Sequence, residues 1–402
     1  MIPQGRYIVF FMVLLAIAHF SKRMYLYYFD TTQPQVAVIG FEDGKAYAGE
    51  VIGSLKGSSP YKVAHVSMWI DDNVMHREFK INRKQFDHPI SIPAMTIPDG
   101  LHSLKFEIVD GTKHQNKTCV SHSFYTDNVS LQAAFVPSSS GNKVQQGRCL
   151  RIQVQTNKQV KLIVARVLTG EYFFFPESKN SLVYETYVPI ECEQDAGEYP
   201  FSVEVLDRLG SKIVLEDTFQ VVSVAFKKKI LNVQGNKLQS ELEFTQKQEA
   251  DLEIELEKLA KQSGSEKLWN GPFDVPIVMK GITTEFGVIR TSQERGRRVH
   301  KALDLVADPK SVIWSSHNGV IVLKDRFTHS GNTVIVDHGC GVLSLYYHLH
   351  DFADIAVGQR VKKGHPLGRM GMTGYASGDH LHWEIRVNNV AVEPMQWTQR
   401  WI

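Results

Sequence analysis

The chain has 402 residues, 43% hydrophobic and 22% charged, which is the composition of a globular protein with several domains rather than of a disordered or fibrous one. Its 45 Lys and Arg residues against 43 Asp and Glu residues give a formal net charge of +2, which excludes the strongly basic class of nucleic-acid-binding proteins. We therefore expect no nucleic-acid partner.

The first residues form an apolar segment that predicts export. Arg6 precedes the apolar run 7–18, which is shorter than the roughly 20 residues of a membrane-spanning helix and nearer the length of a secretory signal. Apolar character returns at 24–29 after a basic pair, so residues 1–29 are interpreted as either a cleaved signal peptide or a retained membrane anchor. A soluble buried helix is the third alternative.

Two β-modules are expected next, because residues 33–224 read as short alternating runs broken by Gly, Asp, Asn, Pro and Ser. The stretches 97–117 and 193–213 share one plan, in which a turn, an alternating apolar strand and an Asp follow one another. We predict two immunoglobulin-like β-sandwich modules, at residues 30–126 and 127–225.

The four cysteines show no C-x-x-C spacing, so the sequence supports neither a zinc knuckle nor a thioredoxin-type redox motif. Cys149 and Cys192 are the first pair to test for a bridge, because both fall in expected strands of one module. Four reduced, buried thiols are the alternative.

A helical linker is predicted at residues 226–267. Residues 238–262 are dense in Glu, Lys, Gln and Leu, contain no Pro or Gly, and place apolar residues at helical spacing. The helix is either a solvated linker or an element packed over the functional groove of the following domain.

The remaining domain, residues 268–402, carries polar residues at spacings that bring them together. Even separations along an extended chain place side chains on one face, so HKALD at 300–304 groups His300 with Asp304. HLHWEIRV at 380–387 likewise turns His380 and His382 to one face, while the opposite face carries Leu381, Trp383, Ile385 and Val387.

These residue types suit a catalytic zinc site, which uses three protein ligands and leaves a position for water. His300, Asp304 and His382 are the candidate ligands, and His348 and His380 remain for proton transfer and charge stabilisation. The chain has no HExxH sequence, which excludes the thermolysin arrangement. We interpret His350 as peripheral and assign structural roles to the turn-like histidines His317, His329, His338 and His365.

With these motifs in order, the stretch 268–397 resembles the lysostaphin/LytM zinc endopeptidases. HKALD resembles the H-x-G-x-D motif, which implies zinc ligation by His300 and Asp304. SLYYHLH resembles the Tyr-x-His-Leu motif, which implies a catalytic His348, and HLHWE resembles the terminal H-x-H strand, which implies a catalytic His380 and His382 as third ligand. The sequence departs from the family at Ala302, where Gly is usual, and at Asp379, where Pro is usual.

The resemblance implies a mostly β chain that ends in an antiparallel-β peptidase domain with a duplicated-hybrid-motif-like fold and one Zn²⁺. It implies an endopeptidase acting on stem or cross-bridge peptides of peptidoglycan, in the periplasm or cell envelope, with an envelope protein as a possible partner of the β-modules. Two alternatives are a catalytically silent relative that activates another wall hydrolase and a structural or adhesive envelope protein.

Overall fold

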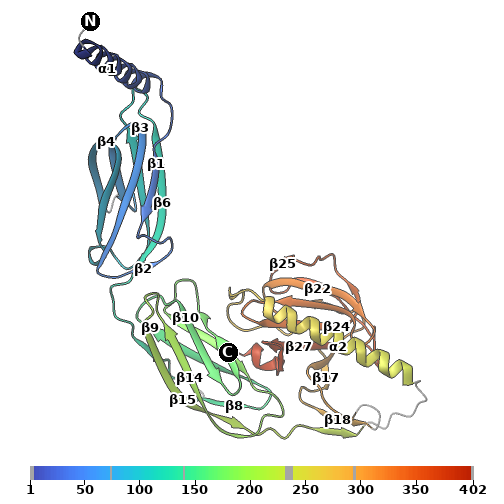
Figure 1. Cartoon of the computed structure of the whole chain (residues 1–402). Coiled ribbons are helices and arrows are strands. Elements are labelled where there is room, and N and C mark those ends of the chain that lie inside the picture. The colour runs from blue at the N-terminus through green and yellow to red at the C-terminus, as the bar shows by residue number, and fades with distance from the viewer. Residues whose placement is uncertain (1–3, 73–74, 139–140, 231–238, 293–295, 400–402) are drawn as a thin grey trace. The chain divides into compact units, whose positions relative to one another are not determined.

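In the computed structural model, residues 4–72, 75–138, 141–230, 239–292 and 296–399 are described, and most of them lie in β-strands, as predicted (Figure 1). The chain divides into two compact units. The first comprises residues 1–131 with 207–211, and the second comprises residues 132–206 with 212–402.

The apolar N-terminal segment forms one helix, α1 (Gln4–Phe29). Its part from Tyr7 to Phe29, 23 residues with a mean hydropathy of 1.5, is long and apolar enough to cross a membrane, and none of it is buried. Both apolar runs and the basic pair Lys22 and Arg23 therefore belong to one helix, which is longer than the run 7–18 indicates. A signal sequence meets the same criteria, so both interpretations of this segment stand.

The first β-module is one hydrogen-bonded sheet in the order β1-β3-β5-β6-β2, with β4 paired to β3. Its strands are β1 (Gln35–Ile39), β2 (Ala46–Tyr47), β3 (Glu50–Ile70), β4 (Met75–Pro93), β5 (Gly100–Asp110) and β6 (Lys117–Thr126), and a 3-10 turn spans Ala94–Thr96. The long strand β3 pairs with β1, β4 and β5, and the register of the β3–β4 pair shifts between Ser58 and His65. Immunoglobulin-like architecture stays a prediction for this module.

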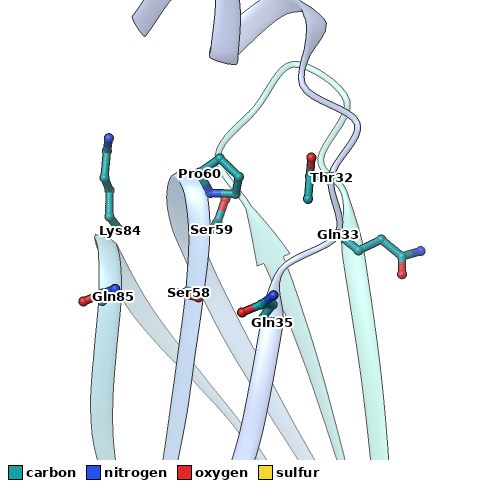
Figure 2. Close-up of a pocket in the computed structure, with 8 residues that line it drawn as sticks. All are labelled: Thr32, Gln33, Gln35, Ser58, Ser59, Pro60, Lys84 and Gln85. Carbon is teal, nitrogen blue, oxygen red and sulfur yellow. The ribbon is translucent and has the colours of Figure 1, made fainter. Parts of the chain in front are cut away.

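Figure 2 shows a pocket in this module where β1, β3 and β4 lie close to the residues that follow α1. Its eight lining residues include Thr32, Gln35, Ser59 and Lys84, and none of the eight is a His, Cys, Asp or Glu. The pocket therefore offers no typical metal ligand, and Lys84 is the one side chain in its lining that carries a charge.

The second β-module consists of two sheets, in the orders β11-β10-β14-β15-β8 and β12-β13-β9-β7. The strands are β7 (Ala133–Phe135), β8 (Lys143–Gln145), β9 (Cys149–Thr156), β10 (Leu162–Val167), β11 (Gly170–Phe173), β12 (Phe175–Pro176), β13 (Val183–Pro189), β14 (Gly197–Leu206) and β15 (Lys212–Val222). All four cysteines of the chain are free thiols. Cys149 begins β9 and is buried, whereas Cys192 lies in a turn, so the expectation that both cysteines fall in strands is wrong. Of the two alternatives, the structure has free thiols, although Cys119 is exposed and not buried.

The last domain is built on a ten-stranded sheet whose main order is β17-β20-β27-β24-β23-β22-β25. Its strands are β17 (Gly281–Thr284), β20 (Leu303–Val306), β21 (Val312–Trp314), β22 (Gly319–Phe327), β23 (Gly331–Asp337), β24 (Val342–Phe352), β25 (Arg360–Val361), β26 (Pro366–Met370), β27 (Leu381–Val387) and β28 (Val390–Val392). A 3-10 turn spans Pro394–Thr398, and a small sheet joins β16 (Lys228–Ile230), β18 (Ile289–Ser292) and β19 (Gly296–Val299).

The second module and the last domain share one hydrophobic core. Phe175 and Tyr187 of the module belong to the same buried cluster as Trp269 and Trp397 of the domain. The ring centroids of Tyr187 and Trp397 lie 5.3 Å apart. The Gln396 side chain accepts from the Cys149 backbone N–H at 2.8 Å and donates to its carbonyl at 2.9 Å. Residues from both parts thus form one packed unit.

The predicted linker helix is α2 (Gln239–Gln262), and it lies across the sheet that contains β22 and β24 (Figure 1). Leu252, Leu256 and Leu259, at spacings of four and three residues, are buried against the sheet side chains Leu323, Ile335, Leu343, Leu345 and Tyr347. Exposed pairs such as Glu257–Lys261, at 2.6 Å, occupy the solvent side. The helix is therefore packed on the domain and is not a free linker.

Candidate metal centre

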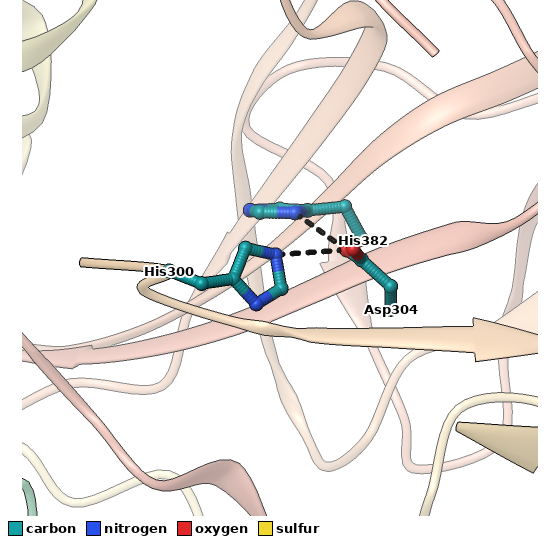
Figure 3. A group of neighbouring side chains, drawn as sticks. All are labelled: His300, Asp304 and His382. Carbon is teal, nitrogen blue, oxygen red and sulfur yellow. Dashed lines mark hydrogen bonds and ion pairs between the residues drawn. The ribbon is translucent and has the colours of Figure 1, made fainter. Parts of the chain in front are cut away.

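Three of the predicted residues converge at one point of the ten-stranded sheet (Figure 3). Strand register places Asp304 of β20 opposite His382 of β27. His300 Nε2 and His382 Nδ1 each lie 3.0 Å from Asp304 Oδ1. One ligand atom from each residue lies within 4.8 Å of those of the other two. Two imidazole nitrogens and one carboxylate oxygen at such separations are a donor set that suits Zn²⁺.

In each of the two candidate histidine ligands, one ring nitrogen faces Asp304 and the other contacts a group outside the centre. The nitrogens that face Asp304 are His300 Nε2 and His382 Nδ1. His300 Nδ1 donates to the Glu285 carbonyl at 3.0 Å, and His382 Nε2 lies 3.8 Å from Glu384 Oε2. Zinc-binding histidines in proteins are usually oriented by a carbonyl or carboxylate in this way. The orientation of both rings therefore fits a metal at this place.

The charges at the centre are coupled. Burial alone would raise the pKa of Asp304, but the bonds from His300 and His382 hold it well below its usual range. Burial alone would lower the pKa of His382, but Asp304 and Glu384 raise it to about 9. Without metal the centre thus holds a carboxylate next to an imidazolium, and a metal cation must displace the proton of His382.

His348 and His380 lie beside this centre. Their ring centroids are 4.8 Å apart, and His380 Nε2 is 3.8 Å from Asp304 Oδ1. His348 Nδ1 donates to the Thr373 carbonyl at 2.8 Å, and His380 Nδ1 donates to the Gly378 carbonyl at 2.9 Å. In both rings Nδ1 is therefore held by a main-chain carbonyl, and Nε2 is the nitrogen that faces away from that bond.

His348 is buried, and its backbone has a φ of +64°, a left-handed conformation uncommon outside glycine. Burial, followed by the neighbouring His382 and His380, lowers the pKa of the His348 imidazole to about 3. The ring is therefore neutral near pH 7 and carries an acceptor lone pair on Nε2.

Four further residues support the centre, and the sequence analysis did not identify them. Arg290 donates to Asp304 Oδ2 at 3.3 Å and to Thr284 Oγ1 at 3.1 Å. The Tyr347 ring stacks on the His382 ring at 5.1 Å and 2°. Glu384 shares the strand face of His382, so the alternation of HLHWE contains a signal for it. Thr284 and Tyr347 have no comparable signal, because they reach the centre through pairing of β17 with β20 and of β24 with β27. Arg290 has none either, because it reaches the centre from β18 of the small sheet.

Three other histidines of this domain lie outside the metal centre. His350 is exposed, and His317 and His338 are buried and bond backbone carbonyls of Asn270 and Asn318. Ala302 is fully buried, and Asp379 is exposed, with the His380 Nδ1 bond going to Gly378 instead. The His380 ring is therefore oriented by a main-chain carbonyl and not by the Asp379 carboxylate.

Residues 298–394, which contain all five candidate residues, match Peptidase family M23. The chain is 36% identical over 126 residues to the DD-carboxypeptidase/endopeptidase Mpg of Neisseria meningitidis serogroup B, covering 31% of this chain and 29% of that protein. It is 30% identical over 120 residues to the peptidoglycan DD-endopeptidase ShyC of Vibrio cholerae, covering 30% of this chain and 28% of ShyC. The chain thus spans less than a third of the length of these relatives.

Among solved structures, a putative peptidase M23 from Pseudomonas aeruginosa aligns with a TM-score of 0.47 and 22% identity. That alignment covers 63% of this chain and 94% of the other. On the sequence matches, the C-terminal part of this chain contains a Peptidase family M23 domain that is homologous to DD-endopeptidases.

Proposed function

We propose that this chain is a zinc-dependent endopeptidase that hydrolyses amide bonds in the stem or cross-bridge peptides of peptidoglycan. The observation that carries the proposal is the convergence of His300, Asp304 and His382 within 4.8 Å, with two further imidazoles at its edge. Three protein donors leave a position for water, which is the arrangement of catalytic rather than structural zinc sites.

His300, Asp304 and His382 would hold the zinc, which supplies Lewis acidity and makes water a stronger acid near neutral pH. Neutral His348, with Nε2 facing away from the Thr373 carbonyl, is suited to accept a proton from the attacking water. His380 Nε2 faces the same space and is suited to donate to the oxygen or nitrogen of the scissile amide. The exchange of these two roles is equally compatible with the distances.

The substrate class rests on the relatives. Mpg is named as a DD-carboxypeptidase/endopeptidase, and ShyC as a peptidoglycan DD-endopeptidase. A peptidoglycan substrate would place this protein outside the cytoplasm, in the periplasm or cell envelope. Helix α1 fits that location, since it is apolar enough either to direct export or to tether the chain to the membrane.

The test combines metal analysis with hydrolysis. The purified protein, residues 30–402, is expected to contain about one zinc per chain and to release peptide-linked fragments from purified sacculi, which mass analysis would assign to one bond type. His382→Ala is the matched control, expected to lose both. A chain that binds zinc but leaves sacculi and cross-linked peptides uncut would contradict the proposal.

A further inference from the structure

One carboxylate of helix α2 contacts the two chain segments that carry His300 and His382, two of the three candidate ligands. Glu253 accepts from Arg386 Nη2 at 2.9 Å and from Arg386 Nη1 at 2.5 Å, and from Lys301 Nζ at 3.0 Å. Lys301 directly follows His300, and Arg386 lies on β27 four residues after His382. These contacts bridge 133 and 48 residues of sequence.

The contacts of Arg386 lead back to the centre. Arg386 Nε donates to Glu384 Oε1 at 2.5 Å, and Arg386 Nη1 also donates to Asn389 Oδ1 at 3.0 Å. Arg386 and Glu384 are each 3% exposed, and the other oxygen of Glu384 lies 3.8 Å from His382 Nε2. A buried ion pair depends on all its partners, because removing one leaves an uncompensated charge. Glu253, Arg386, Glu384 and His382 thus form a continuous chain of charges.

Helix α2 also packs against Tyr347, the second side chain that contacts His382. Tyr347, whose ring stacks flat on the His382 ring, belongs to the same buried cluster as Leu252, Leu256 and Leu259 of α2. The helix therefore packs against the aromatic ring on one side of His382 and fixes the ion pair behind it.

The charge state of Glu253 agrees with this geometry. Burial alone would raise the pKa of Glu253, but the bonds from Arg386 and Lys301 lower it to about 2. Glu253 is therefore ionised wherever the protein is folded near neutral pH.

We propose that Glu253 of helix α2 is a positioning residue of the metal centre, and that the docking of α2 sets the affinity of His300, Asp304 and His382 for zinc. The inference rests on the proposed zinc site. Residues that orient a metal ligand from behind typically change metal affinity by about 10- to 100-fold when they are replaced. Because the helix precedes the domain in sequence, a change in its docking would tune catalysis without touching a ligand.

The test is zinc affinity, measured by competition with a chromophoric chelator, in the protein comprising residues 30–402. Glu253→Gln is expected to weaken zinc binding about 10- to 100-fold and to shift the absorption bands of the Co²⁺-loaded protein. Excess zinc is expected to restore hydrolysis. Glu257→Gln is the matched control, since Glu257 lies on the solvent side of the same helix and pairs with Lys261.

A double-variant cycle separates positioning from general destabilisation. If Glu253 acts through Glu384, Glu253→Gln combined with Glu384→Gln loses no more zinc affinity than Glu384→Gln alone. Independent, additive losses would overturn the inference, as would a Glu253→Gln protein that binds zinc within about twofold of the wild type. A wild-type protein that binds neither zinc nor Co²⁺ would overturn the proposed function as well, whereas an active wild type with an unaffected Glu253→Gln overturns this inference alone.

Discussion

The two β-modules bury their apolar residues in different ways. The core of the first module, which includes Phe106 and Phe124, contains side chains from residues 36–124 only. The second module instead contributes Phe175 and Tyr187 to the core of the peptidase domain. A module that shares a core with a catalytic domain is part of that domain's folding unit, whereas one with its own core can vary without disturbing the catalytic geometry.

The largest expected effect is at the ligands. His382→Ala should abolish both stoichiometric zinc and hydrolysis, because it removes one of three donors. Phe106→Ala in the first module should leave zinc content and the hydrolysis of soluble peptides unchanged. Metal analysis and a peptide assay on both variants check this, and zinc loss in Phe106→Ala would break the separation between the first module and the catalytic unit.

Replacing His348 or His380, the two imidazoles that are not candidate ligands, should lower the hydrolysis rate without removing zinc. His348→Ala and His380→Ala are each expected to lower the rate about 10²- to 10⁴-fold while zinc is retained, because each removes a proton-transfer group and no ligand. Single-turnover hydrolysis with parallel zinc analysis measures both quantities. Loss of zinc in either variant would assign that histidine to the metal instead.

A matched pair of phenylalanines tests the shared core directly. Phe175→Ala and Phe106→Ala should each cost about 3–5 kcal/mol of unfolding free energy, since both remove a buried ring. Only Phe175→Ala should lower the temperature at which the zinc site and the peptidase activity are lost. Thermal unfolding followed in parallel with activity distinguishes them, and equal effects on activity would show that the modules do not differ.

The smallest expected effect is the loss of folding stability at acidic pH. Burial lowers the pKa of His338 in the catalytic unit to about 3. An unfolded histidine has a pKa near 6.5, so below about pH 6.5 the unfolded chain binds a proton that the folded chain rejects, and stability falls as the pH falls toward 3. Between pH 7 and 5 this amounts to about 2 kcal/mol. Urea unfolding at the two pH values should show a smaller difference for His338→Gln, and an unchanged difference would assign the acid sensitivity elsewhere.

Local patterns account for much of what was predicted. The alternation of HLHWEIRV predicted that Trp383 and Ile385 would face the core and His382 the opposite side, and the spacing of leucines predicted α2. Local patterns do not encode partners that are distant in sequence. The contact of Glu253 with Arg386 and the bond from His348 to the Thr373 carbonyl depend on how the sheet closes.

The first module illustrates a second limit. Gly57, Ser58, Ser59 and Pro60 read as a turn, yet they lie within the 21-residue strand β3. Pairing with β1 and β4 on either side of this stretch overrides the local preference. Sheet membership is therefore decided by long-range partners, which is why the architecture of residues 30–126 could not be derived from the spacing of turn residues.

The two hydrogen bonds between the Gln396 side chain and the Cys149 backbone have a consequence for how the chain folds during its synthesis. The two residues are 247 positions apart, so the second module emerges from the ribosome long before the segment that covers its apolar side. Until Trp397 and its neighbours are synthesised, Phe175 and Tyr187 lack the aromatic residues against which they pack. An exposed apolar surface of this kind in a nascent chain favours aggregation and binding by chaperones. The second module can therefore complete its packing only after residues 269–397 have been synthesised, so its folding depends on a segment that ends about 200 residues after Tyr187.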